Sequence, residues 1–259
     1  MRRKSTMKIS HVGVDIAKSV FQIHAADRLG KALWRVKLSR SQWIDKLCEK
    51  VPATAVIAME SCAGAHHWAR VLQARGYTVR LIDARFVKPY VKSNKNDRAD
   101  AEAICEALTR PGMRFVTPKS VAQQDIQAMH RIRAELVDQR TAKANQIRGL
   151  VGEYGIVAPR GIGQLRQALP DWCELVDSGL SMPFRALLQG LYEDLKRLDE
   201  RVSELDEQIG RQVAEDSAAK RLMELRGVGP LIASALSASL GDGKSFKCGR
   251  DFAASLGLT

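Results

Sequence analysis

An apolar run, His11-Val12-Gly13-Val14-Asp15-Ile16, carries a single acid near its end. A second run, Val56-Ile57-Ala58-Met59-Glu60, also ends in an acid. Short apolar runs of this kind predict buried strands. An ionised carboxylate on such a strand is costly unless it is paired or holds a metal ion. Because adjacent strands of an open α/β sheet bring their ends together, we expect Asp15 and Glu60 to meet at one rim.

Strand-like and helix-like patterns alternate through the N-terminal part of the chain, which indicates an α/β domain. Further strands are predicted at 20–25, 32–38 and 79–82, and helices at 42–50, 65–75 and 98–108. From residue 120 onward only helical patterns remain, chiefly at 120–154 and 183–216. The predicted fold class is therefore α/β followed by all-α.

The helix predicted at 183–216 carries a seven-residue apolar repeat. Its stripe alternates spacings of three and four through Leu188, Leu191, Leu195, Leu198, Val202, Leu205 and Ile209. A repeat sustained over several heptads predicts a coiled-coil seam, and with it a homodimer or tetramer. The alternative is a long helix packed inside a single globular fold.

Two more acids, Asp97 and Asp100, lie three residues apart where a helix is predicted to begin. This spacing places both carboxylates on one face near the helix N-terminus. With Asp15 and Glu60 they form a set of four hard oxygen ligands, which suits Mg²⁺ or Mn²⁺ better than zinc. Two such ions about 3.5–4 Å apart stabilise the attacking and leaving oxygens of a phosphodiester displacement. The alternative roles are an N-cap for Asp97 and an exposed first-turn acid for Asp100; Asp83, which also ends a predicted strand, is left outside the set.

The composition favours a nucleic-acid partner. Lysine and arginine number 41 against 29 acids, for a net charge of +12 and a pI near 9.7, and such an excess favours a polyanion. Apolar residues make up 45% of the chain, which excludes disorder as its main state, and there is no 18-residue apolar run to predict a membrane span. The five cysteines include no Cys-x-x-Cys pair. This pattern argues against a zinc ribbon or a disulfide framework and predicts a cytoplasmic protein, nucleoid-associated when bound to DNA.

A hairpin motif follows the second long helix. Gly227-Val228-Gly229 separates a short helical run from a small-residue helix predicted at 231–240. A helix, a Gly-Val-Gly turn and a second helix are typical of a helix-hairpin-helix, whose backbone N–H groups bind one phosphate without reading the base sequence. The alternative is a glycine-capped connection between two core helices.

Three blocks of the sequence carry a family resemblance: Val12-Gly13-Val14-Asp15-Ile16-Ala17-Lys18, Ala58-Met59-Glu60-Ser61-Cys62 and Lys95-Asn96-Asp97-Arg98-Ala99-Asp100-Ala101-Glu102-Ala103. Further support comes from Arg140-Thr141, Asn145-Gln146-Ile147-Arg148-Gly149-Leu150 and Gly227-Val228-Gly229-Pro230. In these blocks, which follow the family's order, the chain resembles the DEDD-type insertion-sequence transposases related to pilin-gene invertases. The RNA-guided members of that family are called bridge recombinases.

The resemblance implies a ribonuclease-H-like (RuvC-like) domain at 7–117, a helical and coiled-coil region at 118–217 and a partial C-terminal transposase domain at 218–259. It also implies that the four acids, Asp15, Glu60, Asp97 and Asp100, are catalytic residues that bind the metal ions. It also implies a recombinase that cleaves and exchanges DNA strands, with a guide RNA as a further candidate partner. The nucleic-acid contacts that we expect are Lys18, Lys92, Lys95, Arg140, Arg148, Gly227, Val228 and Gly229.

Members of this family also use a nucleophilic serine, in a Ser-Gly-Gly-Lys-like stretch, to form a transient 5′-phosphoserine link. The sequence ends at Leu258-Thr259, where that stretch would begin, and no serine present matches it. The resemblance therefore implies a chain that stops before the catalytic serine. A second hypothesis follows from this: a catalytically inactive remnant that still binds DNA and dimerises.

Two other enzyme classes match the sequence less well. A DEDD exonuclease carries a second acid two residues after the first, where this chain has Ala17. A sugar-kinase-like or actin-like ATPase has a phosphate loop that residues 15–19 distantly resemble, but it requires a glycine at Ala17 and a later glycine-rich adenosine loop.

Overall fold

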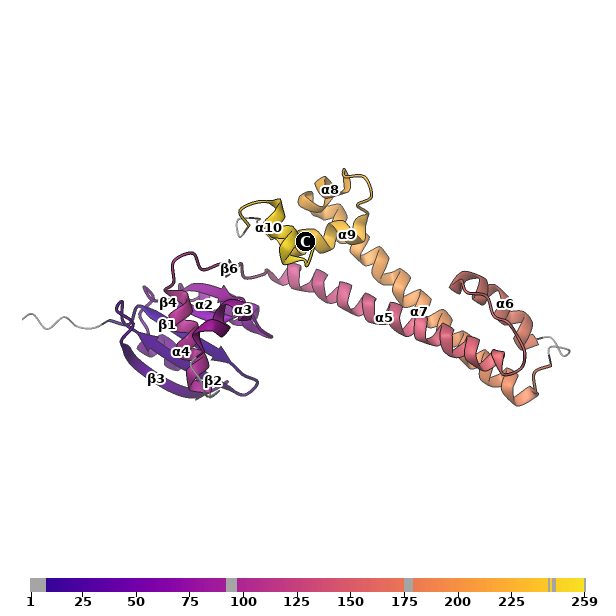
Figure 1. Ribbon diagram of the computed structural model, residues 1–259, viewed down its shortest axis with the longest axis horizontal. Helices are drawn as coiled ribbons and strands as arrows, with labels where there is room; N and C mark the ends of the chain where they lie inside the picture. Colours follow the sequence, from indigo (N-terminus) through magenta and orange to yellow (C-terminus); the bar gives the residue numbers. More distant parts are fainter. Residues whose placement is uncertain (1–7, 92–96, 175–178, 242, 244–245, 259) are drawn as a thin grey trace, which may run out of the picture. The chain divides into compact units, whose positions relative to one another are not determined.

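The computed structural model describes residues 8–91, 97–174, 179–241, 243 and 246–258, and of Asp97 and Arg98 it describes the backbone alone. The chain divides into two compact units, Met1–Ser120 with Gly241–Thr259, and Val121–Leu240. Figure 1 shows a sheet flanked by helices in the first unit and a pair of long helices in the second. The predicted order, an α/β region followed by a helical one, is confirmed.

The first unit is built on a six-stranded mixed sheet of order β3-β2-β1-β4-β5-β6. Three strands form an antiparallel meander: β1 (His11–Ile16), β2 (Val20–Ala26) and β3 (Ala32–Ser39). The other half of the sheet starts with two strands parallel to β1 and ends with an antiparallel one: β4 (Val56–Glu60), β5 (Thr78–Ile82) and β6 (Phe115–Val116). A mixed sheet of this kind is consistent with a ribonuclease-H-like fold.

Both faces of the sheet are covered, because successive residues of a strand point to opposite sides. On one face, Val12 and Val14 of β1 join a core with residues of α1 (Trp43–Lys50) and α2 (Ala65–Gln73). Elements of the other face lie after β5: α3 (Ala84–Val87), the 3-10 helix η1 (Lys88–Tyr90) and α4 (Asp97–Leu108). Gly13 and Asp15 alternate with the two valines and therefore belong to the face that α4 covers.

The second unit consists mainly of two long helices that lie side by side, α5 (Val121–Gly152) and α7 (Met182–Glu215) (Figure 1). Ion pairs join them at three levels: Arg133 with Asp206, Arg140 with Asp199 at 3.2 Å, and Lys143 with Asp194 at 3.2 Å. The residue numbers rise along α5 while they fall along α7. The two helices are therefore antiparallel.

The heptad stripe of α7 is divided between buried and half-buried positions. Every seventh residue, namely Leu188, Leu195, Val202 and Ile209, is buried inside this chain. The intervening Leu191, Leu198 and Leu205 are half-buried. The first set packs in the chain itself, as the alternative of a single globular fold predicts. Of the second set, Leu191 also packs against the core formed with α5 and α6, so Leu198 and Leu205 are the positions of the stripe that leave apolar surface for another copy.

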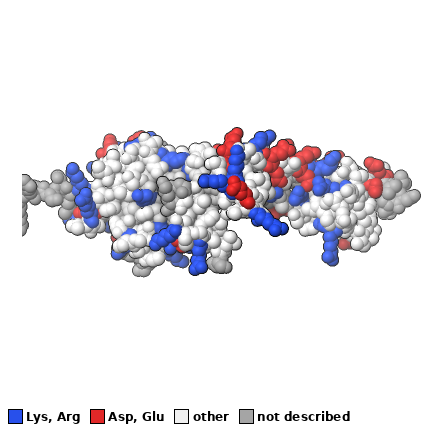
Figure 2. Space-filling view, turned by 90° about the horizontal axis from the view of Figure 1, so that it is seen from above, with Lys and Arg blue, Asp and Glu red and all other residues white. Residues whose placement is uncertain are grey.

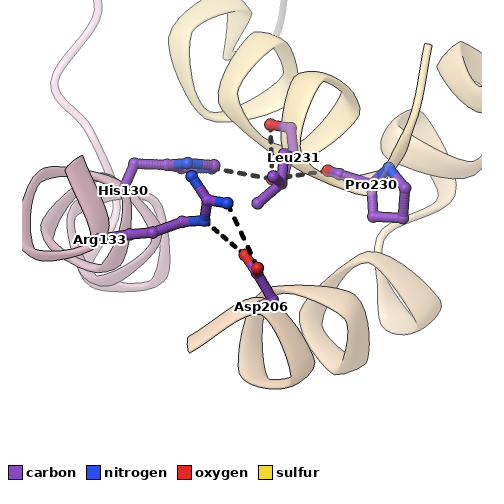
Figure 3. A network of polar contacts seen from close by, with 6 residues as sticks. His130, Arg133, Asp206, Pro230 and Leu231 are labelled. Carbon is purple, nitrogen blue, oxygen red and sulfur yellow. Dashed lines mark hydrogen bonds and ion pairs between the residues drawn. The ribbon is translucent and has the colours of Figure 1, made fainter. Parts of the chain in front are cut away.

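Three shorter helices belong to the second unit: α6 (Ile162–Glu174), α8 (Ser217–Met223) and α9 (Pro230–Leu240). Figure 3 shows polar contacts that join α9 to α5 and α5 to α7. The Ser234 hydroxyl donates to the Pro230 carbonyl at 2.9 Å, and His130 Nε2 of α5 lies 2.9 Å from the same hydroxyl oxygen. The guanidinium of Arg133, one turn further along α5, pairs with Asp206 of α7.

Some elements differ from the sequence-based predictions. Helix α6 was not predicted, because the glycines at 152–163 indicate a loop and Pro170 lies inside the helix. The elements α3, η1 and β6 are too short to leave a periodic pattern. A further short helix, α10 (Gly249–Ser255), follows α9 along the chain. Among the described residues, no helix is long and apolar enough to cross a membrane.

Candidate metal centre

Asp15 and Glu60 lie next to each other at one rim of the sheet. The parallel strands β1 and β4 pair Val14 with Met59, and each acid is the next residue of its strand. Continued by one step, this register places Asp15 beside Glu60 on the same face. It is the face that α4 covers, since Ala58, two residues before Glu60, packs against residues of α4.

Helix α4 brings Asp100 to the same rim. The backbone of α4 lies directly on β1, where the Ala101 carbonyl and the Cys105 N–H are the nearest groups to Gly13. Asp100 immediately precedes Ala101, and its charge is close enough to Glu60 to raise the pKa of that carboxyl. Three of the four predicted acids, Asp15, Glu60 and Asp100, are thus brought to one end of the sheet.

Neighbouring negative charges act on groups at this rim of the sheet. The pKa of Glu60 is raised, first by burial and then by the negative charges of Asp100 and Asp83. The Cys62 thiol, just beyond β4, also has a raised pKa, because of burial and the charges of Glu60 and Asp15. The acids therefore form a region of unusually negative potential, which a divalent cation would relieve.

Asp83 lies near this region but has a structural role. Its carboxylate accepts a hydrogen bond from the Arg85 backbone N–H at 2.9 Å and so caps α3. The same carboxylate pairs with the Arg85 guanidinium at 3.0 Å, and this hydrogen bond lowers the pKa of Asp83. The exclusion of Asp83 from the predicted ligand set is consistent with these contacts.

The fourth predicted acid, Asp97, begins α4, but its side chain lies outside the described residues, as do Lys92 and Lys95. Among the side chains that the structure does describe, no three acids, histidines or cysteines are already arranged to hold a metal ion. The acids available are all hard oxygen donors, and the pKa of Glu60 is raised first by burial and then by the charges of Asp100 and Asp83. This donor set fits Mg²⁺ or Mn²⁺.

One further polar residue belongs to this rim and was not predicted. Gln22 of β2 is the register partner of Asp15, and its side chain is only 8% exposed. The signal was available in the short turn at 17–19, which fixes the hairpin register and sets Gln22 opposite Asp15. Of the residues of β2, Gln22 is therefore the one directly opposite Asp15, and its amide is neutral and can form hydrogen bonds.

A separate cavity of about 400 Å³ lies toward the other end of α4. His11, His24, Arg35 and Glu102 are among the residues that line it, and its lining includes none of the four predicted acids. Two ion pairs lie in this lining, Arg35 with Glu102 at 3.2 Å and Arg110 with Glu106. The cavity is therefore distinct from the carboxylate rim.

The residues predicted to contact nucleic acid fall into two groups. Lys18 is exposed in the turn between β1 and β2. Arg140 and Arg148 are instead engaged within the chain: Arg140 pairs with Asp199, and Arg148 donates to the carbonyls of Pro159 and Arg160 at 2.9 and 2.6 Å. Both arginines therefore have structural contacts that a nucleic acid would have to share or displace.

The predicted Gly-Val-Gly turn joins α8 to α9. Gly227 has a φ of +89°, a conformation that glycine adopts without strain. The Val228 N–H donates to the Leu225 carbonyl at 3.1 Å, and Val228 packs against a small core that contains Ala219 and Ala233. The helix–turn–helix order of the predicted motif is present, and its phosphate-binding role stays a prediction.

Positive charge is unevenly distributed along the sequence. Residues 1–120 hold 23 lysines and arginines against 10 acids, whereas residues 121–259 hold 18 against 19. The excess of +12 therefore resides in the part of the chain that also holds the four acids. On the face shown in Figure 2, acidic side chains gather over the long helices, whereas lysines and arginines predominate over the N-terminal unit.

Comparisons with known proteins agree with this architecture. A family model described as "Transposase" and named for DEDD transposases of the IS110 type matches residues 12–156. A second model, described as "Transposase IS116/IS110/IS902 family", matches residues 219–259. The chain belongs to the IS110/IS116 family of transposases. The first match covers the sheet, α4 and α5, so it includes all four predicted acids.

Individual relatives are similar over almost the whole chain. A "Probable family 20 transposase" of Pseudomonas aeruginosa is 46% identical over 253 residues, which are 97% of this chain and 74% of the relative. The transposase for insertion sequence IS1328 of Yersinia enterocolitica is 41% identical, over 96% of this chain and 73% of its own length. The transposase for insertion sequence IS1111A of Coxiella burnetii is 40% identical, over 99% of this chain and 70% of its own length. As a transposase of the IS110/IS116 family, the chain acts on DNA, and the DEDD class to which it belongs is generally metal-dependent.

Proposed function

We propose that this chain binds the DNA of its insertion sequence and takes part in metal-dependent strand cleavage and exchange. Asp15, Glu60, Asp97 and Asp100 would hold the metal, which we expect to be Mg²⁺ or Mn²⁺. The observation that supports this most directly is the register of β1 and β4, which sets Asp15 beside Glu60, with α4 packed on Gly13 next to Asp100. The pKa of Glu60 is raised, first by burial and then by the charges of Asp100 and Asp83, which agrees with this placement. A cluster of like charges at a strand end favours a cation and has no evident structural purpose.

The metal would polarise the scissile phosphate and lower the pKa of an attacking hydroxyl. Residues of the chain would hold the metal ion in place and orient its ligands. Asp15 and Glu60, fixed by the pairing of β1 with β4, would supply ligands from the sheet, and Asp97 and Asp100 would supply them from α4. Gln22 would orient the Asp15 carboxylate from the neighbouring strand.

We propose that the nucleic acid lies along the N-terminal unit, since the excess of lysine and arginine resides in residues 1–120. Lys18, Lys92 and Lys95 would contact phosphates close to the acids. The turn Gly227-Val228-Gly229 would hold a second stretch of backbone through its N–H groups. A guide RNA is the further partner that the family resemblance implies, and sequencing of the RNA that co-purifies with the protein tests for it.

We propose that two copies associate through Leu198 and Leu205 of the half-buried stripe, because Leu191 and the buried heptad positions pack within the chain. Two copies would present two metal centres, one for each DNA partner. Sedimentation of the wild-type chain and of a Leu198→Glu variant tests this association. The proposal expects a dimer for the wild type and a monomer for the variant.

Cleavage of a labelled DNA duplex that contains the element's end tests the metal centre. The comparison is between Glu60→Gln and Asp83→Asn, since both changes remove one negative charge near the rim and only Glu60 is a proposed ligand. We expect Glu60→Gln to abolish cleavage, by a factor of 100 or more, and Asp83→Asn to retain it. Equal activity of wild type and Glu60→Gln would remove Glu60 from the proposed mechanism.

A second candidate function is a DNA-binding and dimerising protein without catalysis. It is favoured by the basic charge of residues 1–120 and by the half-buried stripe, neither of which depends on the acids. Gel-shift binding that is insensitive to Mg²⁺, together with no cleavage at any Mg²⁺ concentration, would support this candidate. Cleavage that requires Mg²⁺ would exclude it.

A further inference from the structure

Gly13 stands where helix α4 meets the sheet. A Cβ atom built on Gly13 would lie 2.2 Å from the carbonyl oxygen of Ala101, 2.6 Å from the backbone N of Cys105 and 2.9 Å from its Cβ. All three distances are shorter than real Cβ contacts. Two of the three atoms belong to the backbone of α4, so no change of rotamer can relieve the overlap. The requirement for glycine at position 13 is therefore one of space.

Backbone conformation does not explain this glycine. Gly13 is absent from the described glycines with positive φ and has the ordinary extended conformation of a strand residue. Among the described glycines, those at turns, such as Gly30 and Gly76, have positive φ and open space around the missing Cβ. Gly13 shows the opposite combination, an ordinary φ and a helix packed against it. Its lack of a side chain thus sets how closely α4 approaches β1.

The same contact determines the position of Asp100 relative to the strand acids. Asp100 directly precedes Ala101, whose carbonyl rests on Gly13. Asp15 is two residues beyond Gly13 on the same face of β1, about 6.6 Å along the strand. Because α4 is a continuous helix, raising its backbone at Ala101 and Cys105 also raises Asp100 away from Asp15 and Glu60. Mg²⁺ requires its ligands at about 2.0–2.1 Å in near-ideal geometry, so a displacement of about 1 Å disrupts its site.

We propose that Gly13 is a positioning residue of the metal centre: it seats α4 on β1 at the height that lets Asp100 share a cation with Asp15 and Glu60. This inference rests on the proposed function, because it requires that the acids bind a metal ion. According to this inference, Gly13 affects the affinity for the metal ion in addition to the stability of the fold, although it has no side chain.

The reactivity of the Cys105 thiol measures how closely α4 packs on β1, whether or not a metal ion is bound. Its side chain is 4% exposed, and burial raises the pKa of its thiol to about 12. Of the five cysteines, Cys48 and Cys248 are exposed and Cys62 and Cys173 are half-buried. Cys105 should therefore react most slowly with a thiol reagent, and lifting α4 from Gly13 should accelerate this one thiol alone.

The test is Gly13→Ala in the full chain, with Mn²⁺ binding measured by calorimetry well below the melting temperature. The matched control is Gly190→Ala on α7, where a built Cβ meets nothing within 4 Å. We expect Gly13→Ala to keep its far-UV circular dichroism, to bind Mn²⁺ at least 10-fold more weakly and to expose one additional fast thiol. We expect Gly190→Ala to bind like the wild type. A folded Gly13→Ala protein with wild-type Mn²⁺ affinity would overturn the inference.

If Gly13→Ala does not fold, all five thiols should react equally fast. A second variant then tests the inference. Ala58→Val adds volume beneath α4 from the neighbouring strand β4, at a buried position that already carries a side chain. A several-fold loss of Mn²⁺ affinity in folded Ala58→Val supports the inference, and unchanged affinity overturns it. Absence of Mn²⁺ binding in the wild type is a different result, since it rejects the proposed metal centre itself.

Discussion

Asp15 of β1 and Glu60 of β4 lie side by side on neighbouring parallel strands, one step beyond the register pair of Val14 and Met59. Two carboxylates at this spacing raise each other's cost of ionisation unless a cation lies between them. The pKa of Glu60 is raised, first by burial and then by the charges of Asp100 on α4 and of Asp83.

Divalent metal should stabilise the N-terminal unit through Glu60. A ligand present at 100 times its Kd stabilises the folded state by about 2.7 kcal/mol, which corresponds to roughly 5–10 °C in Tm for a chain of this size. We expect Mn²⁺ to raise the Tm of the wild type and of Asp83→Asn, and to leave that of Glu60→Gln unchanged. Differential scanning calorimetry with and without Mn²⁺ measures these shifts.

Without metal, Glu60 should make stability depend on pH. Folding raises the pKa of this carboxyl above its ordinary value of 4.5. Its favourable contribution is therefore complete below pH 4.5 and is lost as the pH rises through the raised value. We expect Glu60→Gln to be more stable than the wild type at pH 7 in a chelator, and the difference to vanish near pH 4. Urea denaturation at the two pH values tests this, and a wild type more stable than Glu60→Gln at pH 7 would contradict it.

The heptad stripe of α7 should divide into two functional sets. Leu195 is fully buried within the chain, so Leu195→Ala should cost about 2–5 kcal/mol at every protein concentration. Leu198 is half-buried, so Leu198→Ala should cost less stability and should weaken association of copies. Urea denaturation and sedimentation over a range of concentrations separate the two effects. Equal effects of both variants on association would argue for a seam shared between copies.

The contact of His130 with Ser234 should hold α9 in place. The Ser234 hydroxyl oxygen lies 2.9 Å from His130 Nε2 of α5 and 2.9 Å from the Pro230 carbonyl oxygen of its own helix (Figure 3). Removal of one partner should cost about 0.5–1.5 kcal/mol. A double-mutant cycle of His130→Ala and Ser234→Ala, read by urea denaturation, measures the coupling. Strictly additive effects of the two substitutions would show that the contact is not energetically significant.

Lys18 should contribute to DNA affinity without contributing to sequence preference. A lysine that contacts phosphate weakens binding uniformly when it is removed and lowers the slope of log K against log salt by about 1. We expect this result for Lys18→Ala in fluorescence-anisotropy titrations. Arg140→Ala serves as the contrast, because Arg140 pairs with Asp199 and its removal should chiefly lower stability.

Much of the N-terminal unit could be predicted from the sequence, because strands such as His11–Ile16 and Val56–Glu60 are short apolar runs bounded by turns. The acids could be located for the same reason, since an acid at the end of a buried strand is conspicuous in the pattern. The role of Gly13 could not be predicted, because it depends on which helix packs on β1 and how closely. Sequence spacing carries no information on that distance.

The helical unit was predicted less completely. Periodicity located α5 and α7 within two residues, but it could not decide whether the heptad stripe packs within the chain or between copies. That choice depends on the antiparallel ion pairs between the two helices, such as Lys143 with Asp194, which link residues far apart in the sequence. Helix α6 was missed because its Pro170 is a residue that ordinarily interrupts a helix.

Anomalous X-ray diffraction from crystals of the protein grown with Mn²⁺ would locate the metal ion and its ligands. We expect a manganese peak at the sheet rim, about 2 Å from carboxylate oxygens of Asp15, Glu60 and Asp100, with Asp97 completing the set. A well-ordered rim without manganese, or manganese bound only elsewhere on the chain, would contradict it.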